Sequence, residues 1–207
     1  MTEEQIKKDA EALFSQAGNA HDFLHTERVL ALAERISCGI YENRSLLTAA
    51  CMFHDIGRLF PEKGKNHAVI SAEWSRKHLG EYGFSKEETE EAALAIETHS
   101  WSGGREPENI LGMILQDSDR IDALGAVGLA RMFSFAEGES LYCKDDPACE
   151  SGRQPDQEKY TADHAYQKLF SIPERLHFEK SKNIAERRAS FMREFFMHMK
   201  SEINGEQ

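Results

Sequence analysis

Apolar side chains recur along the chain at intervals of three and four residues, the spacing of an amphipathic helix. Residues 3–16 show this pattern with Ile6, Ala10, Leu13 and Phe14. Similar stretches predict helices over residues 25–36, 45–57, 68–79, 86–99, 108–116, 121–135, 161–171 and 177–203. Strand-like alternation and internal repeats are not evident in the sequence. We therefore predict an all-α fold.

Polar residues mark where two of these helices begin. Asp22 precedes one predicted helix and Ser85 precedes another, and both residue types are preferred N-caps. The stretch 45–57, SLLTAACMFHDIG, is apolar almost all round, as is typical of a helix buried on every side. We expect it to form the centre of the fold.

The length of 207 residues suits one domain. We predict a compact single-domain helical bundle, with core motifs in residues 21–135 and C-terminal helices in residues 161–203. The segment 136–160 is polar and rich in Gly, Asp and Pro, so we predict a long loop. Long loops in compact domains are often lids or binding loops. A disordered surface excursion is the alternative, and the segment could also hold a small hairpin.

Charge and composition narrow the function. The formal net charge of -11 argues against binding to nucleic acid polymers, whose phosphates are neutralised by Lys and Arg. A small anionic substrate remains compatible, because a metal can reverse the local field. No apolar run approaches the roughly 20 residues that span a bilayer. The acidic, amphipathic N-terminal segment does not resemble a secretory signal. We expect a cytoplasmic protein without a membrane partner.

The four cysteines show no CxxC spacing. We therefore expect neither a structural zinc site nor a disulfide.

An adjacent histidine and aspartate, His54 and Asp55, interrupt the most apolar stretch. Ionisable groups in such a place are costly unless they have a partner. Imidazole with carboxylate suits Mn²⁺, Fe²⁺, Co²⁺ or Zn²⁺ better than Ca²⁺. Neighbouring helical residues point about 100° apart, so both reach one ion only if it lies beside the helix. The alternative for His54 is a histidine satisfied within the core.

Two distant segments supply further candidate ligands. His25 lies in the first turn of its predicted helix, and Arg28 projects from the same face one turn later. A surface salt bridge is the alternative for Arg28. Asp119 belongs to LQDSDRIDALG, which follows an apolar run, and helix capping is the alternative for it. A single divalent cation could satisfy His25, His54, Asp55 and Asp119 together.

The order H…HD…D resembles the HD-domain superfamily of metal-dependent phosphohydrolases. AHDFLHTERVLALAERI is similar to the helix that carries the first ligand, His25, and its outer pair His21-Asp22 then caps the helix. FHDIGR holds His54 and Asp55, which correspond to the signature dyad of the family. LQDSDRIDALGAVGLAR resembles the family's Asp-bearing segment and aligns Asp119 with its metal-binding aspartate. TADHAYQKLF and KNIAERRASFMREF also resemble a small bacterial branch of stand-alone HD hydrolases. The resemblance implies a helical bundle around one metal site, whose ligands are His25, His54, Asp55 and Asp119.

The proton-transfer residue is less clear from the pattern. Arg58 stands where related proteins of this branch often carry an acid, so another acid must act if that one handles protons. We name Asp122, three residues beyond Asp119, and Glu62; Asp117 is a further candidate. Structural capping is an equally good interpretation of Asp122.

Several cations and histidines are candidates for contact with a substrate phosphate. The resemblance places His99 at the cleft, although a helix C-terminus also favours a histidine through the macrodipole. Lys63 lies in a loop soon after the dyad, where solvation is the ordinary role of a lysine. His67 is a further candidate for the same cleft. We predict substrate contacts from Arg28, Arg58, His99 and Lys63.

A bound divalent ion (Mn²⁺, Fe²⁺, Co²⁺, Zn²⁺ or Mg²⁺) would lower the pKa of a coordinated water and polarise a phosphoryl oxygen. The resemblance implies a nucleotide substrate, with a (deoxy)nucleoside triphosphate first and another nucleoside phosphate second. A metal-stabilised protein that binds a nucleotide without turnover is the alternative. An oxygenase would need ligands for a second iron, and a second His-Asp set is not obvious. We expect a monomer or homodimer whose partner is a small phosphate ester.

Overall fold

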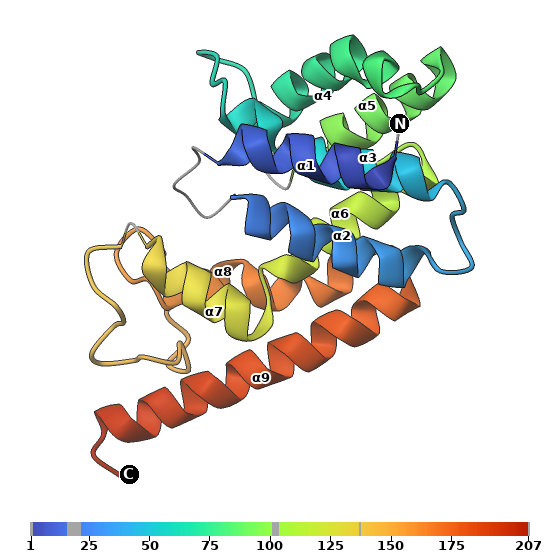
Figure 1. Ribbon diagram of the computed structural model, residues 1–207. Coiled ribbons are helices and arrows are strands. Elements are labelled where there is room, and N and C mark those ends of the chain that lie inside the picture. The colour runs from blue at the N-terminus through green and yellow to red at the C-terminus, as the bar shows by residue number, and fades with distance from the viewer. Residues whose placement is uncertain (1, 16–21, 101–103, 137, 207) are drawn as a thin grey trace. The chain divides into compact units, whose positions relative to one another are not determined.

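The computed structural model describes residues 2–15, 22–100, 104–136 and 138–206, and it is helical (Figure 1). The α-helices are α1 (Glu3–Phe14), α2 (Phe23–Ser37), α3 (Arg44–Phe53), α4 (His67–His78), α5 (Lys86–Thr98), α6 (Ile110–Asp122), α7 (Gly125–Ser134), α8 (Asp163–Gln167) and α9 (Glu179–Ile203). Short 3-10 helices are η1 (Ile56–Arg58), η2 (Leu79–Tyr82), η4 (Leu169–Ser171) and η5 (Pro173–Arg175). The all-α prediction is confirmed.

Contacts divide the chain into two compact units, Met1–Arg120 and Ile121–Gln207. Helix α6 carries the boundary near its C-terminal end. The arrangement of the whole chain as a single domain stays a prediction.

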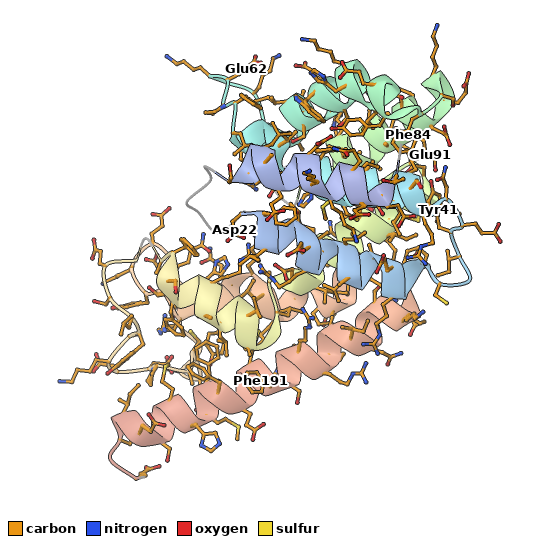
Figure 2. The ribbon with its side chains drawn as sticks, viewed as in Figure 1. Asp22, Tyr41, Glu62, Phe84, Glu91 and Phe191 are labelled. Atoms are coloured by element: carbon orange, nitrogen blue, oxygen red, sulfur yellow. The ribbon has the colours of Figure 1, made fainter. Side chains whose placement is uncertain are left out.

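Helix α3 is the centre of the first unit. Every residue from Leu46 to Phe53 is buried, and α3 packs against α1, α2 and α5. Helix α5 in turn packs along α4, and the two run side by side in Figure 1. At the edge of this layer the Tyr41 hydroxyl donates to Glu91 at 3.0 Å (Figure 2). The all-round apolar pattern thus predicted the position of α3 correctly.

Helix α3 ends earlier than the predicted residue 57, because the chain tightens into η1 after His54. This turn packs closely against α4: the Gly57 N–H donates to Ser71 Oγ at 2.9 Å. A Cβ on Gly57 would lie 2.3 Å from the His67 carbonyl oxygen. The close approach of backbone to backbone therefore requires glycine here. This close approach also fixes the neighbouring pair His54 and Asp55 against the start of α4.

Helix α6 runs without a break through the acids of LQDSDRID, where we predicted a boundary between residues 116 and 121. The break falls instead at Gly125, which begins α7 with φ of +80°. Glycine adopts this left-handed conformation at little cost.

The second unit is built on α9, which packs against α7 and η5. Aromatic rings of the half-buried Tyr166 and Phe170 pack against that of the buried Phe196, with centroids 5.2–6.1 Å apart. The predicted helix over 161–171 is divided into α8 and η4, because Lys168 leaves the helical conformation with φ of -133° and ψ of -55°.

The segment 138–160 does not form the small hairpin that we considered. Its described residues contain one isolated parallel bridge, between Ser140 and Tyr160. The segment is instead held by buried Asp163, whose carboxylate accepts from Arg153 Nη2 at 2.8 Å and from the Asp156 N–H at 2.7 Å. Arg153 also donates to the Asp146 carbonyl oxygen at 2.9 Å. Buried polar contacts, rather than strand pairing, fix this loop.

None of the helices in the described parts of the chain combines the length and apolar character needed to cross a bilayer.

Candidate metal centre

Helix ends in the first unit bring the predicted ligands together. Asp22 caps α2, and its carboxylate accepts from the His25 N–H at 2.9 Å, which sets His25 in the first turn. His54 is the C-cap of α3, Asp55 follows it, and Asp119 lies in α6. Figure 2 shows Asp22 at the start of α2. His21 lies outside the described residues.

The donor nitrogens of His25 and His54 lie close to each other and to an oxygen of each aspartate, Asp55 and Asp119. His25 Nε2 lies 3.2 Å from His54 Nε2 and 3.3 Å from Asp119 Oδ1. Asp55 Oδ2 lies 3.7 Å from both imidazole nitrogens, and Asp119 Oδ1 lies 3.9 Å from His54 Nε2. Ligands about 2.1 Å from an ion are themselves about 3.0–3.4 Å apart in octahedral or tetrahedral geometry. Slight contraction of this cluster would accommodate a divalent cation.

The tautomer of His54 suits metal binding. Its Nδ1 lies 2.8 Å from the Cys51 carbonyl oxygen, and this contact requires Nδ1 to carry the proton. In the neutral ring the Nε2 lone pair then faces the cluster, the arrangement in which a second partner orients a metal-binding histidine. Burial disfavours the charged ring and lowers the pKa of His54 to about 3. His54 is therefore neutral at ordinary pH.

The cluster is buried except on one side. His25, His54 and Asp55 are at most 1% exposed, whereas the Asp119 side chain is 22% exposed. Burial by itself would raise the pKa of Asp119, but the hydrogen bond and charge of His25 outweigh it and lower the pKa. Asp119 therefore remains an anionic donor on the accessible side.

A second group of side chains surrounds the other oxygen of Asp55. Asp55 Oδ1 lies 2.8 Å from Arg58 Nε, 3.2 Å from His67 Nε2 and 3.5 Å from His99 Nε2. The pKa of His67 is lowered, chiefly by burial. At His99 the hydrogen bond and charge of Asp55 outweigh burial, so its pKa is raised. The two oxygens of Asp55 thus face two different sets of nitrogens.

The other predicted site residues differ in their exposure and in their contacts. Arg28 is half-buried on α2, and Lys63 is exposed in the loop after η1. Arg58, predicted to bind substrate, lies against Asp55, and its substrate contact stays a prediction.

The two proposed proton-transfer acids have other partners. Glu62 is 53% exposed at the tip of a loop, and its carboxylate pairs with Lys65 at 3.0 Å (Figure 2). Asp122 belongs to the second unit, where its buried carboxylate lies 2.6 Å from Arg131 Nη1. These contacts do not favour either acid as the proton acceptor. Asp117 is also buried.

The sequence patterns did not lead us to predict the Arg58–Asp55 ion pair. They also led us to name His67 only as a further candidate for the cleft. Both had a signal in the sequence. Arg58 follows Asp55 by three residues, a spacing that brings side chains together in helical turns. His67 begins α4 directly after Asn66, a residue type preferred at N-caps, whose side chain accepts from the Ala68 N–H at 2.9 Å.

Comparisons with known proteins agree with this geometry. A family model described as the HD domain matches residues 22–124, the range that holds the whole cluster. YpgQ of Bacillus subtilis is 28% identical over 208 residues, which cover 98% of this chain and 94% of that protein. A crystal structure of YpgQ in complex with ADP matches with a TM-score of 0.74 and 26% identity, covering 97% of this chain and 94% of that one.

Two further solved structures are described as a predicted HD-superfamily hydrolase and as an HD-superfamily hydrolase, respectively. The protein from an uncultured Thermotogales bacterium has a TM-score of 0.69 and 28% identity, covering 96% of this chain and 91% of its own. The protein from Bacillus thuringiensis has a TM-score of 0.74 and 25% identity, covering 98% and 96%.

Proposed function

Because the chain belongs to the HD-domain superfamily, we propose that it is a metal-dependent phosphohydrolase that acts on a nucleotide. One observation carries the proposal: two imidazole nitrogens lie 3.2 Å apart with carboxylate oxygens 3.3–3.9 Å from them. Imidazole and carboxylate donors favour a divalent transition metal. His25, His54, Asp55 and Asp119 would hold the ion.

When bound, the ion would supply an acidified water and a positive charge beside the phosphoryl group. The protein's own residues would then orient and neutralise the substrate. Arg28, one helical turn beyond His25, and Lys63 are the cations that we assign to substrate phosphates. The local positive charge matters because the chain carries a net charge of -11 and would otherwise repel an anion.

The nucleotide assignment draws support from the YpgQ structure, which was solved in complex with ADP. YpgQ and this chain are similar over nearly their full lengths, so the same class of ligand is our first choice. We propose a (deoxy)nucleoside triphosphate as the leading substrate, with another nucleoside phosphate second.

A panel of nucleotides tests the proposal. The chain is freed of metal, reloaded with Mn²⁺, Co²⁺, Mg²⁺ or Zn²⁺, and incubated with nucleoside mono-, di- and triphosphates and their deoxy forms. Release of phosphate and of pyrophosphate is measured separately, which identifies the bond that is cleaved. His198→Ala, a change on the exposed face of α9, serves as the control for handling and folding.

The outcomes separate two functions. Metal-dependent release of either product supports a hydrolase. Saturable nucleotide binding with no product from any substrate or metal would contradict it and support the binding protein without turnover.

A further inference from the structure

The Arg58 guanidinium bridges two side chains that could otherwise ligate a cation. Its Nε lies 2.8 Å from Asp55 Oδ1, and its Nη2 donates to His67 Nε2 at 3.1 Å. The two contacted atoms, Asp55 Oδ1 and His67 Nε2, are 3.2 Å apart. One cationic group therefore lies against both atoms, as an ion pair with Asp55 and as a hydrogen-bond donor to His67.

These two atoms belong to a larger donor set. His99 Nε2 lies 3.5 Å from Asp55 Oδ1, and His99 Nδ1 lies 2.6 Å from the Ile96 carbonyl oxygen. That carbonyl accepts the Nδ1 proton, so in the neutral ring the Nε2 lone pair faces Asp55. The ring of His99 also lies close to those of His54 and His67, with centroids 4.9 and 5.3 Å apart. His54, Asp55 and His99 by themselves have donor atoms close enough to share an ion.

The spacing in this second set resembles that in the first. Separations of 3.2 and 3.5 Å are near the distance of about 3.0–3.4 Å between ligands on one ion. Asp55 would contribute one oxygen to each set. Without Arg58, the side chains of Asp55, His67 and His99 would therefore suit a second divalent ion that shares the Asp55 carboxylate with the first.

Charge opposes the joint presence of Arg58 and a second ion beside Asp55 Oδ1. A guanidinium remains protonated at all ordinary pH values, so it cannot vacate the site by losing a proton. The Asp55 carboxylate is only 1% exposed, and repulsion between cations is strong where water is excluded. Arg58 is itself 31% exposed, which leaves room for its replacement by other side chains.

We propose that Arg58 takes the place of a second metal ion and thereby limits the centre to one ion, held by His25, His54, Asp55 and Asp119. The inference rests on the metal centre of the proposed function. It makes Arg58 a positioning residue rather than a ligand of substrate. The simpler reading, that Arg58 only orients Asp55, gives a different result when Arg58 is removed.

The number of metal ions bound per chain distinguishes the proposed role of Arg58 from the alternative that it only orients Asp55. Metal-free wild type, Arg58→Ala, Arg58→Gln and Arg58→Lys are titrated with Mn²⁺ by calorimetry. The Mn²⁺ bound per chain is then measured by elemental analysis after gel filtration. The double variant Arg58→Ala/His99→Ala removes the cation together with a ligand of the second set. Circular dichroism establishes that each variant is folded, and two uncharged replacements guard against failure of either one.

We expect one tightly bound ion in wild type and in Arg58→Lys, two in Arg58→Ala and Arg58→Gln, and one again in the double variant. The two ions should also give the electron paramagnetic resonance spectrum of an exchange-coupled Mn²⁺ pair, because they share a carboxylate. If folded Arg58→Ala and Arg58→Gln each bind only one ion, whatever its affinity, the proposed role of Arg58 is wrong. That result would leave the metal centre of the proposed function intact. Two ions in wild type would overturn the role of Arg58 as well, whereas no ion in wild type would overturn the metal centre itself.

Discussion

His25 Nε2 and His54 Nε2 lie 3.2 Å apart, although 29 residues separate the two histidines in the sequence. The Cys51 carbonyl holds the proton of His54 on Nδ1, so His54 presents a lone pair to its neighbour when neutral. A cation between the two rings would satisfy both nitrogens, and the carboxylates of Asp55 and Asp119 would complete its surroundings.

Loss of His54 should remove metal binding and turnover together. His54→Ala deletes a buried ligand, and we expect metal affinity to fall by at least ~100-fold. Loss of a group that only hydrogen-bonds to a ligand already lowers metal affinity by roughly 10–100-fold. Affinity is measured by Mn²⁺ titration, and activity is measured on the best nucleotide of the panel. His198→Ala should match wild type in both. Full activity of metal-free His54→Ala would contradict the scheme.

Bound metal should stabilise the folded chain. An ion that binds only the folded state adds about 2.7 kcal/mol to the free energy of unfolding at a concentration ~100 times its dissociation constant. We therefore expect Mn²⁺ to raise Tm in wild type and a chelator to reverse the rise. Asp119→Asn, which weakens the donor on the accessible side, should show a smaller rise. Equal rises in wild type and Asp119→Asn would indicate that Mn²⁺ acts elsewhere.

The close contact at Gly57 should not tolerate a side chain. In Gly57→Ala the added Cβ would lie 2.3 Å from the His67 carbonyl oxygen and 2.9 Å from Ile70 Cβ. We expect destabilisation of about 1–3 kcal/mol from overpacking, measured by urea unfolding. Metal affinity should also fall, because η1 and α4 carry Arg58 and His67.

The matched control is Gly80→Ala, where an added Cβ meets nothing within 4 Å. It should be neutral within about 0.5 kcal/mol or slightly stabilising. Equal effects at the two glycines would refute the account of η1.

The loop contacts of the second unit should make stability depend on pH. Burial by itself would raise the pKa of Asp163, but its bonds to Arg153 and to the Asp156 N–H outweigh burial and lower it. A carboxyl whose folded pKa is depressed stabilises the fold fully above its unfolded pKa of about 3.9. That stability is lost as the pH falls through the folded value.

Asp163→Asn should therefore cost about 2–3 kcal/mol near pH 7, because it leaves Arg153 without its buried anion. The difference between variant and wild type should shrink as the pH is lowered from about 5 to 2, in urea unfolding followed at each pH. Asp145→Asn, a change at an exposed position, is the control. A difference that stays constant with pH would show that the Asp163 charge is not responsible.

Local patterns in the sequence were sufficient to predict much of this structure. The all-round apolar stretch predicted the central place of α3, and Asp22 and Ser85 cap their helices as their residue types suggested. The resemblance to HD domains selected four residues, of which the two histidine nitrogens lie 3.2 Å apart and 3.3–3.9 Å from an oxygen of each aspartate. These features follow from neighbours along the chain or from a recognised motif.

Features that depend on distant partners were harder to predict. Helix α6 continues through its acids, of which Asp119 lies against His25 and Asp122 pairs with Arg131, and no local pattern indicates these partners. Arg153 and Asp163, ten residues apart, fix a predicted long loop whose composition also allowed a disordered excursion. The shared surroundings of Asp55, with His67 and His99 on one side, likewise appear only when α4 and α5 pack together.

The location of a bound ion is the most direct test of the account. Crystals of the chain grown with Mn²⁺ should show one anomalous scattering peak per chain, about 2.0–2.3 Å from His25 Nε2, His54 Nε2 and oxygens of Asp55 and Asp119. A protein that carries Mn²⁺ elsewhere, or none at saturating concentration, would contradict the central claim that these four side chains hold a single cation.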